Sequence, residues 1–193
     1  MIMIRELILK NRSYRRFDET AKISMEQVMS WIDLARLSPF GSNKQSLKFM
    51  ISVDKDTNAI IFPTLNWAGA LKDWDGPAEG ERPAAYIVIL GDHEISNTFG
   101  VNHGIAAQSI LLGAVAAGYG GCMLGSIKRP ILQEMLQLSE RYEILLVIAL
   151  GKPVEEVQLT NIPENGSIDY WRDGRSTHYV PKRTLQDIIL KIK

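Results

Sequence analysis

The stretch that constrains the fold most is residues 102–121, which read NHGIAAQSILLGAVAAGYGG. Its apolar residues cover most of the circumference of a helix, and this pattern predicts a central helix that is nearly buried. Two near-continuous apolar runs flank it, AYIVIL at 85–90 and ILLVIAL at 144–150, and such runs are typical of strands buried on both faces. We therefore expect an α+β or mixed α/β chain with one sheet between helices.

Shorter elements surround this central pattern. Apolar residues at helical spacing predict a short N-terminal helix that ends near Asn11. Ser24 stands three residues before Gln27, which is the spacing of a capping box, so a second helix should begin there and stop at Pro39. The remaining expected elements are a strand at 47–53, a short helical segment at 66–74 and an amphipathic helix at 129–138.

The apolar pattern thins from Lys152 onward, and residues 161–183 read as a long irregular arm that carries aromatic side chains. Such an arm is unusual in a compact monomer, and it would make sense if it packed on a partner chain. We expect a single domain over 1–193, with 152–193 as an extended C-terminal arm.

Composition excludes several classes of protein. The 193 residues carry 22 basic and 22 acidic side chains, and this balance argues against bulk nucleic-acid binding. The single cysteine, Cys122, cannot form an internal disulfide and fits a reducing compartment. The N-terminus lacks the features of a signal peptide, and no apolar run has the length of a membrane span. We expect a soluble, cytoplasmic protein.

Familiar catalytic signatures are absent. The sequence contains no GxGxxG after a strand, no P-loop, no GxSxG and no HExxH. His93, His103 and His178 are separated from one another and from Cys122, so we expect no metal site. Cys122 lies among small residues, where a buried, inert thiol is the better interpretation.

Residues 10–19, KNRSYRRFDE, gather three arginines just after the first predicted helix. Arg12 and Arg15 could bind a phosphate in a bidentate way, with a further hydrogen bond from Ser13, but a solvated run of charge fits this stretch equally well. Two other segments could also meet an anionic ligand. These are the loop SPFGSNKQS at 38–46 and the basic VPKR at 180–183.

The order of these segments is more specific than any one of them. Arg-Ser-x-Arg-x-Phe at 12–17 is followed by SPxxxNxQ at 38–45, by the 104–125 stretch, by IALGKP at 148–153 and by a basic tail. This order resembles the FMN-dependent nitroreductase family, also called the flavin oxidoreductase family, over nearly the whole chain. The resemblance implies an α+β fold with a central, mostly antiparallel sheet flanked by helices, in an interlocked homodimer.

The resemblance also implies a set of FMN-binding residues. Arg12, Ser13 and Arg15 would hold the phosphate and ribityl chain, although Asn11 stands where the family commonly has arginine. Arg16 would face solvent or pair with an acid. The other implied contacts are Pro39, Phe40, Gly41, Ser42, Asn43 and Gln45 from the partner subunit, backbone groups of Met123, Leu124 and Gly125 beside the flavin ring, and Lys182 and Arg183, with Arg175 as a competitor for Arg183.

The implied activity is that of an FMN enzyme in which NAD(P)H reduces the flavin. The flavin then reduces a nitroaromatic, a quinone or a similar electron-poor acceptor in a ping-pong cycle. Because the flavin carries the chemistry, no catalytic side chain is expected. Phe40, Trp67 and Trp74 could wall the acceptor, or they could be ordinary core aromatics. Two alternatives are another chemistry on the same fold, such as reductive dehalogenation or FMN fragmentation, and an FMN-binding module without turnover.

Overall fold

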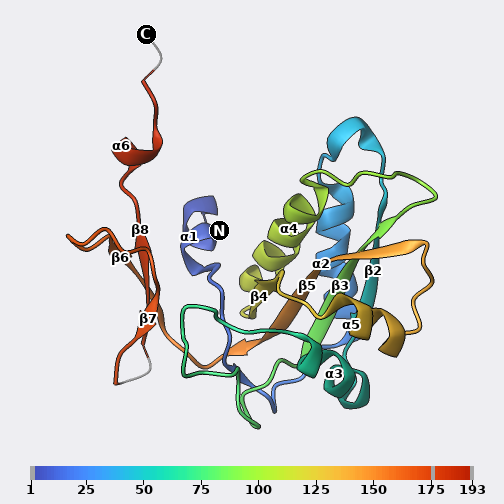
Figure 1. Cartoon of the computed structure of the whole chain (residues 1–193), viewed down its shortest axis with the longest axis horizontal. Coiled ribbons are helices and arrows are strands. Elements are labelled where there is room, and N and C mark those ends of the chain that lie inside the picture. The colour runs from blue at the N-terminus through green and yellow to red at the C-terminus, as the bar shows by residue number, and fades with distance from the viewer. Residues whose placement is uncertain (1–2, 175–176, 192–193) are drawn as a thin grey trace.

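The computed structural model describes residues 3–174 and 177–191. Figure 1 shows a main body built around one sheet and a smaller C-terminal sheet to one side of it, beside the first helix. The elements in chain order are α1 (Ile4–Lys10), β1 (Phe17–Asp18), α2 (Met25–Leu37), η1 (Gly41–Asn43), β2 (Leu47–Ser52), α3 (Lys55–Ile61), η2 (Phe62–Thr64), β3 (Ala85–Asp92), α4 (Asn102–Ala116), β4 (Gly120–Leu124), α5 (Arg129–Met135), β5 (Tyr142–Pro153), β6 (Val157–Asn161), β7 (Trp171–Arg172), β8 (His178–Lys182) and α6 (Leu185–Ile188).

The main sheet has the strand order β1-β5-β3-β2, and β4 also pairs with β5. Every one of these pairings is antiparallel. The two apolar runs of the sequence are the central strands β3 and β5, which place Ile87 opposite Ile148. All eight residues of β3 are buried, so the prediction of a strand covered on both faces is confirmed. The chain has an α+β fold with an antiparallel sheet and helices around it.

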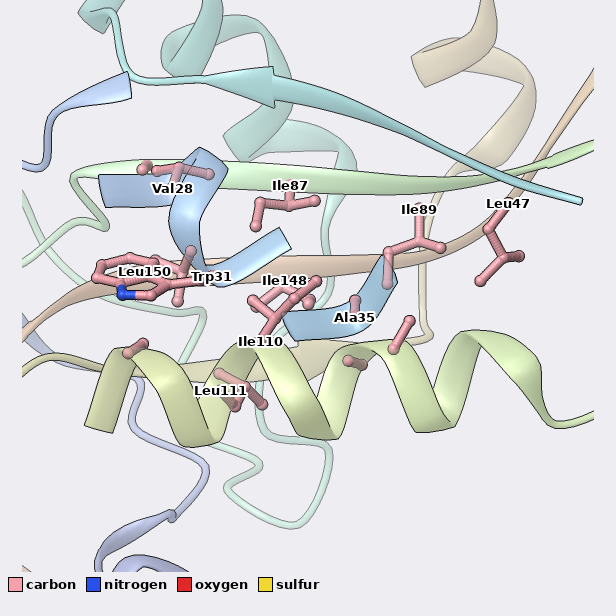
Figure 2. Close-up of a cluster of buried hydrophobic side chains, with 14 of the residues drawn as sticks. Val28, Trp31, Ala35, Leu47, Ile87, Ile89, Ile110, Leu111, Ile148 and Leu150 are labelled. Carbon is pink, nitrogen blue, oxygen red and sulfur yellow. The ribbon is translucent and has the colours of Figure 1, made fainter. Parts of the chain in front are cut away.

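One core cluster fills the space between the sheet and the helices α2 and α4 (Figure 2). Ile87 and Ile148 of the sheet face Val28 and Trp31 of α2 and Ile110 of α4 in this cluster. α4 is central, as its sequence predicted, but it is only about half-buried, since seven of its fifteen residues are buried. Each fully buried side chain of this kind contributes roughly 1.5–3 kcal/mol to folding.

A second cluster covers the opposite face of the sheet. Because side chains alternate along a strand, Tyr86 and Val88 point away from Ile87 and pack with Ile61 of α3 and Leu132 of α5. The main body is therefore a sheet between two helical layers.

Helix α2 begins and ends where its sequence signals place it. The Gln27 backbone N–H donates to Ser24 Oγ at 3.1 Å, and the Ser24 N–H donates to Gln27 Oε1 at 2.9 Å, which completes the capping box. The helix stops at Leu37, two residues before Pro39. The short N-terminal helix also ends as expected, with Asn11 as its C-cap.

The helix predicted at 66–74 is wrong. The helical segment lies earlier, at α3, where Asp54 caps it by accepting a 2.8 Å hydrogen bond from the Thr57 N–H. Residues 66–74 form successive turns instead, with Ala68 at a φ of +38°. Trp67 of this segment is buried in the second cluster, so its apolar residues reflect burial rather than a helical face.

Two strands lie outside the expected elements. Met123 and Leu124 belong to β4, which pairs with β5. Part of the expected irregular arm forms β7 and β8, which join β6 in a three-stranded sheet of order β6-β8-β7, whereas residues 162–170 contain no strand. Trp171 stacks on Tyr179 within it, with ring centroids 5.3 Å apart. The packing of 152–193 on a partner subunit stays a prediction.

Across residues 3–174 and 177–191, no helix combines the length and apolar character that crossing a bilayer would require.

Candidate functional site

A cavity of about 280 Å³ lies between the main body and the C-terminal sheet, and we call it the Arg15 cavity. It brings together five of the residues that the sequence assigned to a cofactor site, namely Arg12, Ser13, Arg15, Met123 and Lys182. The rest of its lining comes from the end of α1, from α4, from β4 and from the C-terminal sheet: Asn11, Gln108, Leu111, Gly121, Val157, Tyr170, His178 and Val180.

Two arginines of this cavity keep unused hydrogen-bond donors. Arg12 donates through Nη2 to the Ile8 carbonyl at 2.7 Å, and its buried Nε has no partner among the described residues. Arg15 lies over the Tyr170 ring, 5.0 Å from its centroid, and its buried Nε is likewise unpaired in this part of the chain. Burial lowers the pKa of Arg12, although the group stays cationic. Cations with spare donors at a cavity wall favour an anionic ligand.

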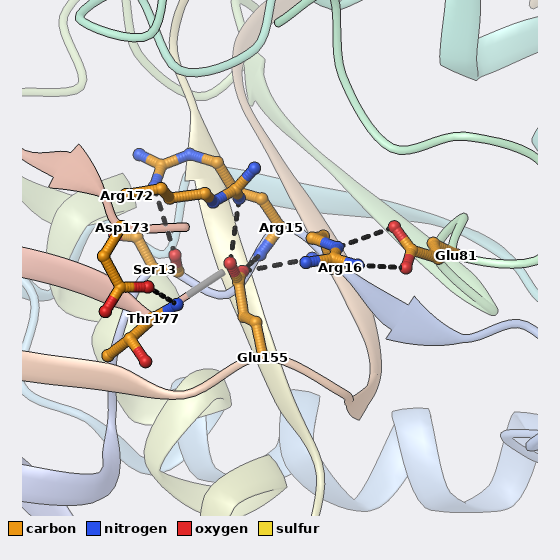
Figure 3. Close-up of polar contacts among 8 residues, drawn as sticks. All are labelled: Ser13, Arg15, Arg16, Glu81, Glu155, Arg172, Asp173 and Thr177. Atoms are coloured by element: carbon orange, nitrogen blue, oxygen red, sulfur yellow. Dashed lines mark hydrogen bonds and ion pairs between the residues drawn. The ribbon is translucent and has the colours of Figure 1, made fainter. Parts of the chain in front are cut away.

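A buried carboxylate fixes the backbone of this arginine segment (Figure 3). Glu155 accepts hydrogen bonds from the main-chain N–H groups of Arg15 and Arg16, the second at 3.1 Å. Its other oxygen accepts from Arg172 Nη2 at 2.8 Å. Arg172 in turn lies over the Trp74 ring at 4.2 Å. Glu155 therefore joins the arginine segment to the C-terminal sheet, a role that no local sequence pattern marks.

Arg16 points away from the Arg15 cavity. Its guanidinium forms a bidentate pair with Glu81, at 2.7 Å from Nε and 2.5 Å from Nη2 (Figure 3). This pairing raises the pKa of Arg16 and lowers the pKa of Glu81. The expectation that Arg16 would pair with an acid is confirmed.

His178 is a further wall residue that sequence reasoning treated as isolated. Its side chain is 1% exposed, and its Nδ1 has no hydrogen-bond partner within the described ranges. Burial, reinforced by Arg15 and Arg172, lowers the pKa of His178 to about 4, so the ring is neutral at pH 7. Every second residue of β8 lines the cavity, namely His178, Val180 and Lys182. Side chains two apart on a strand share a face, so this spacing is the sequence signal that could have placed His178 at the site.

The strand β4 presents one backbone edge to the same region. The Gly121 carbonyl accepts a 3.0 Å hydrogen bond from the Tyr14 N–H, so Gly121 directs its backbone groups away from β5. By the alternation of a strand, the backbone of Met123 faces the same edge. Leu124 is instead buried in the second core cluster, and Gly125 lies beyond the strand end.

The loop at 38–46 lies at the start of α4 in this chain. The Gly41 N–H donates to Asn102 Oδ1 at 3.0 Å. Ser42, Asn43 and Gln45 adopt positive φ angles near +50°, which is an unfavourable conformation for these side chains and typical of functional loops. The predicted contact of Pro39, Phe40, Gly41, Ser42, Asn43 and Gln45 with a partner's flavin stays a prediction.

The remaining predicted residues are spread over other places. Arg183 is exposed and next to Lys182, while Arg175 lies outside the described residues. Trp67 is a core residue of the second cluster, and Phe40 packs against the first cluster. The Trp74 ring lies under the guanidinium of Arg172. None of these side chains is among the described residues that line the Arg15 cavity. The acceptor-binding roles of Phe40, Trp67 and Trp74 stay predictions.

Within the described part of the chain, no three His, Cys, Asp or Glu side chains gather as a group that could hold a metal ion. The fold and the cavity together define an α+β protein with a cationic pocket beside an antiparallel sheet. The chain belongs to the nitroreductase family, because the family model described as Nitroreductase family matches residues 8–152.

Similar proteins agree with this membership. A curated relative, the candidate NAD(P)H nitroreductase YodC of Bacillus subtilis (strain 168), is 24% identical over an alignment that covers 85% of this chain and 96% of the relative. Among solved structures, a candidate nitroreductase in complex with FMN from Exiguobacterium sibiricum 255-15 has a TM-score of 0.68 at 19% identity, with 86% and 95% of the two chains covered. An FMN-dependent nitroreductase from Clostridium difficile R20291 has a TM-score of 0.61 at 22% identity, with 77% and 87% covered.

Proposed function

We propose that this chain is an FMN-dependent oxidoreductase that takes electrons from NAD(P)H and passes them to nitroaromatic, quinone or similar acceptors in a ping-pong cycle. The observation that carries the proposal is the pair of buried Nε atoms of Arg12 and Arg15 on the wall of the Arg15 cavity, which have no hydrogen-bond partner among the described residues. Family membership and the relatives named with FMN and NAD(P)H support it.

The residues of the cavity fit the phosphate end of FMN. An FMN phosphate carries about two negative charges near neutral pH, and burial of such a group requires cationic partners. Arg12 and Arg15 supply donors that nothing else in the described chain satisfies, and Lys182 adds a third cation on the same wall. The Ser13 hydroxyl and the neutral His178 ring can add hydrogen bonds without adding charge. Asn11 is held by Gln108, which accepts its side-chain N–H at 3.3 Å.

FMN, when bound, supplies the hydride and electron chemistry, so this chain's own residues need only bind and orient it. Glu155 fixes the backbone of Arg15, which keeps the phosphate grip in place before a ligand arrives. The free edge of β4 at Met123 offers backbone groups to the polar rim of the flavin ring. Leu124 is apolar and buried, so no side-chain acid or base is assigned at this edge.

A homodimer is part of the proposal. No residue of the loop at 38–46 lines the Arg15 cavity of its own chain, which is the arrangement expected if the loop serves the cavity of a second copy. The C-terminal segment leaves large apolar side chains in solvent, with Leu190 89% and Leu185 63% exposed. A second copy of the chain would cover such side chains.

One rival chemistry has a specific observation in its favour. The enone reductase CLA-ER has a TM-score of 0.64 to this chain, at 18% identity and with 79% and 90% of the two chains covered. An enone would therefore be a reasonable alternative acceptor for the same electron donor. An FMN-binding module without turnover is the other alternative.

The test is a stepwise reduction of the FMN-loaded protein without oxygen. We expect NADH or NADPH to bleach the visible flavin bands in the absence of an acceptor, and a nitroaromatic or quinone to restore them afterwards. Restoration by an enone alone would favour the rival chemistry. Flavin bands that neither nucleotide bleaches would contradict the oxidoreductase assignment and favour the binding module.

A further inference from the structure

A second cavity, of about 320 Å³, lies beside the start of β3 and the residue that follows β2, and we call it the Tyr86 cavity. Its lining comes from α3, from the start of β3 and from the segment that leads into α2. It shares no lining residue with the Arg15 cavity among the residues described, so the cofactor assigned to that site does not explain it. Its size is at the lower end of the range of small-molecule pockets.

The Tyr86 hydroxyl is the first feature that points to a ligand. Tyr86 is 1% exposed, and its hydroxyl has no hydrogen-bond partner among the described residues. A buried hydroxyl without a partner costs roughly 1–3 kcal/mol. Burial raises the pKa of Tyr86, so the group stays protonated and can donate a hydrogen bond to an acceptor placed in the cavity.

Arg82 is the second feature. Its guanidinium lies over the Phe62 ring, 4.5 Å from the centroid, and both residues line the cavity. Its buried Nε has no partner, and no ion pair forms on Arg82 within the part of the chain that the structure describes. The aromatic ring holds the guanidinium flat and leaves its donor edge available to an anion.

The other walls limit what the anion can be. Ile23, Val53 and Ala59 provide apolar surface, which suits a flat hydrocarbon body. Glu19, Lys22 and Lys55 also line the cavity, so together with Arg82 its charged groups are cationic on balance. A carboxylate on a small ring suits both the cationic and the apolar part of the wall, whereas inorganic phosphate has no apolar body to pack on it.

We propose that the Tyr86 cavity binds a small aromatic monocarboxylate, whose carboxylate accepts hydrogen bonds from Arg82 and Tyr86 while its ring packs against Phe62 and Ala59. This site is independent of the FMN site and of the reaction proposed above.

The test is a ligand-detected NMR titration of the FMN-loaded protein with benzoate, benzamide and inorganic phosphate. We expect benzoate to bind and benzamide to bind at least about tenfold more weakly, because the neutral amide lacks the charge-assisted hydrogen bonds of a carboxylate. Phosphate should also bind at least about tenfold more weakly, because it lacks the ring that packs on the apolar wall. Absence of benzoate binding in the millimolar range would overturn the proposal, as would equal binding of benzamide.

Variants locate the site. Arg82→Gln should weaken benzoate binding at least about tenfold, and Tyr86→Phe about two- to tenfold. Ala59→Phe should block binding by filling the cavity, while Arg82 and the Tyr86 hydroxyl stay in place. This variant tests the site even if Arg82→Gln folds poorly. The matched control Arg36→Gln removes an exposed arginine that pairs with Asp33 on the same helix, and it should leave the affinity unchanged. Benzoate binding that survives both Arg82→Gln and Ala59→Phe would overturn the assignment, as would loss of binding in Arg12→Ala, which would place benzoate in the Arg15 cavity.

Discussion

Glu155 and Arg172 form an ion pair of 2.8 Å in which the Glu155 side chain is fully screened from solvent. Glu155 follows β5 of the main body, and Arg172 is on β7 of the C-terminal sheet. Since Glu155 also accepts the main-chain N–H groups of Arg15 and Arg16, one carboxylate holds together three segments that are distant in sequence. The shape of the Arg15 cavity depends on this contact.

Replacing Glu155→Ala should therefore destabilise the protein. The change leaves Arg172 mostly buried without its counter-charge, and loss of one partner of a buried pair costs about 3–5 kcal/mol. Chemical denaturation of the FMN-free protein measures the free energy of unfolding. The neighbouring Glu156→Ala is the control, because Glu156 is exposed and its change should cost under about 0.5 kcal/mol. Equal losses in the two variants would contradict the role of Glu155.

His178 should make stability depend on pH. Its pKa is about 4 in the folded protein and 6.5 as its ordinary value, so the unfolded chain binds the proton more readily. Stability should be fully present above pH 6.5 and fall by roughly 2–3 kcal/mol as the pH drops towards 4. Denaturation midpoints across this window measure the slope, and His178→Asn should flatten it. If the exposed His93→Asn flattens it equally, His178 is not the group responsible.

Two glycines should respond in opposite directions to alanine. A Cβ on Gly121 would lie 2.4 Å from the Ala149 carbonyl oxygen, which β-sheet pairing holds in place, so Gly121→Ala should destabilise by about 1–3 kcal/mol. A Cβ on Gly104 meets nothing within 4 Å, and Gly104→Ala in α4 should stabilise by about 0.5–1 kcal/mol. Thermal melting of both variants checks the pair, and a shift in the same direction for both would refute the packing described for β4.

Local signals explain which parts of the fold were predictable. The start of α2 could be predicted because Ser24 and Gln27 form the two reciprocal hydrogen bonds of a capping box within one turn of the chain. The strands β3 and β5 were readable because burial on both faces leaves an uninterrupted apolar run. Helix α3 did not follow from apolar spacing, because the signal that marks its start is the polar cap in which Asp54 accepts from the Thr57 N–H. Trp67 in the next segment belongs to the second core rather than to a helix.

The C-terminal sheet was unpredictable from local pattern for another reason. Its strands are short and partly polar, and β6 pairs in parallel with β8 across an intervening segment. Only that pairing places His178 and Lys182 on the wall of the Arg15 cavity, opposite Arg12. The arginines themselves were found because their order along the chain matches a family, whereas the role of Glu155 depends on a contact that spans 140 residues.

The most direct test of the central claim is the FMN content of the purified protein after incubation with FMN and removal of the free flavin. The account predicts stoichiometric FMN for the native sequence and for Arg16→Ala, since Arg16 pairs with Glu81 away from the cavity. Replacing both Arg12→Ala and Arg15→Ala should remove the phosphate grip and strip the flavin, while circular dichroism shows a folded chain. A native protein that stays colourless, or a double variant that keeps stoichiometric FMN, would contradict the account.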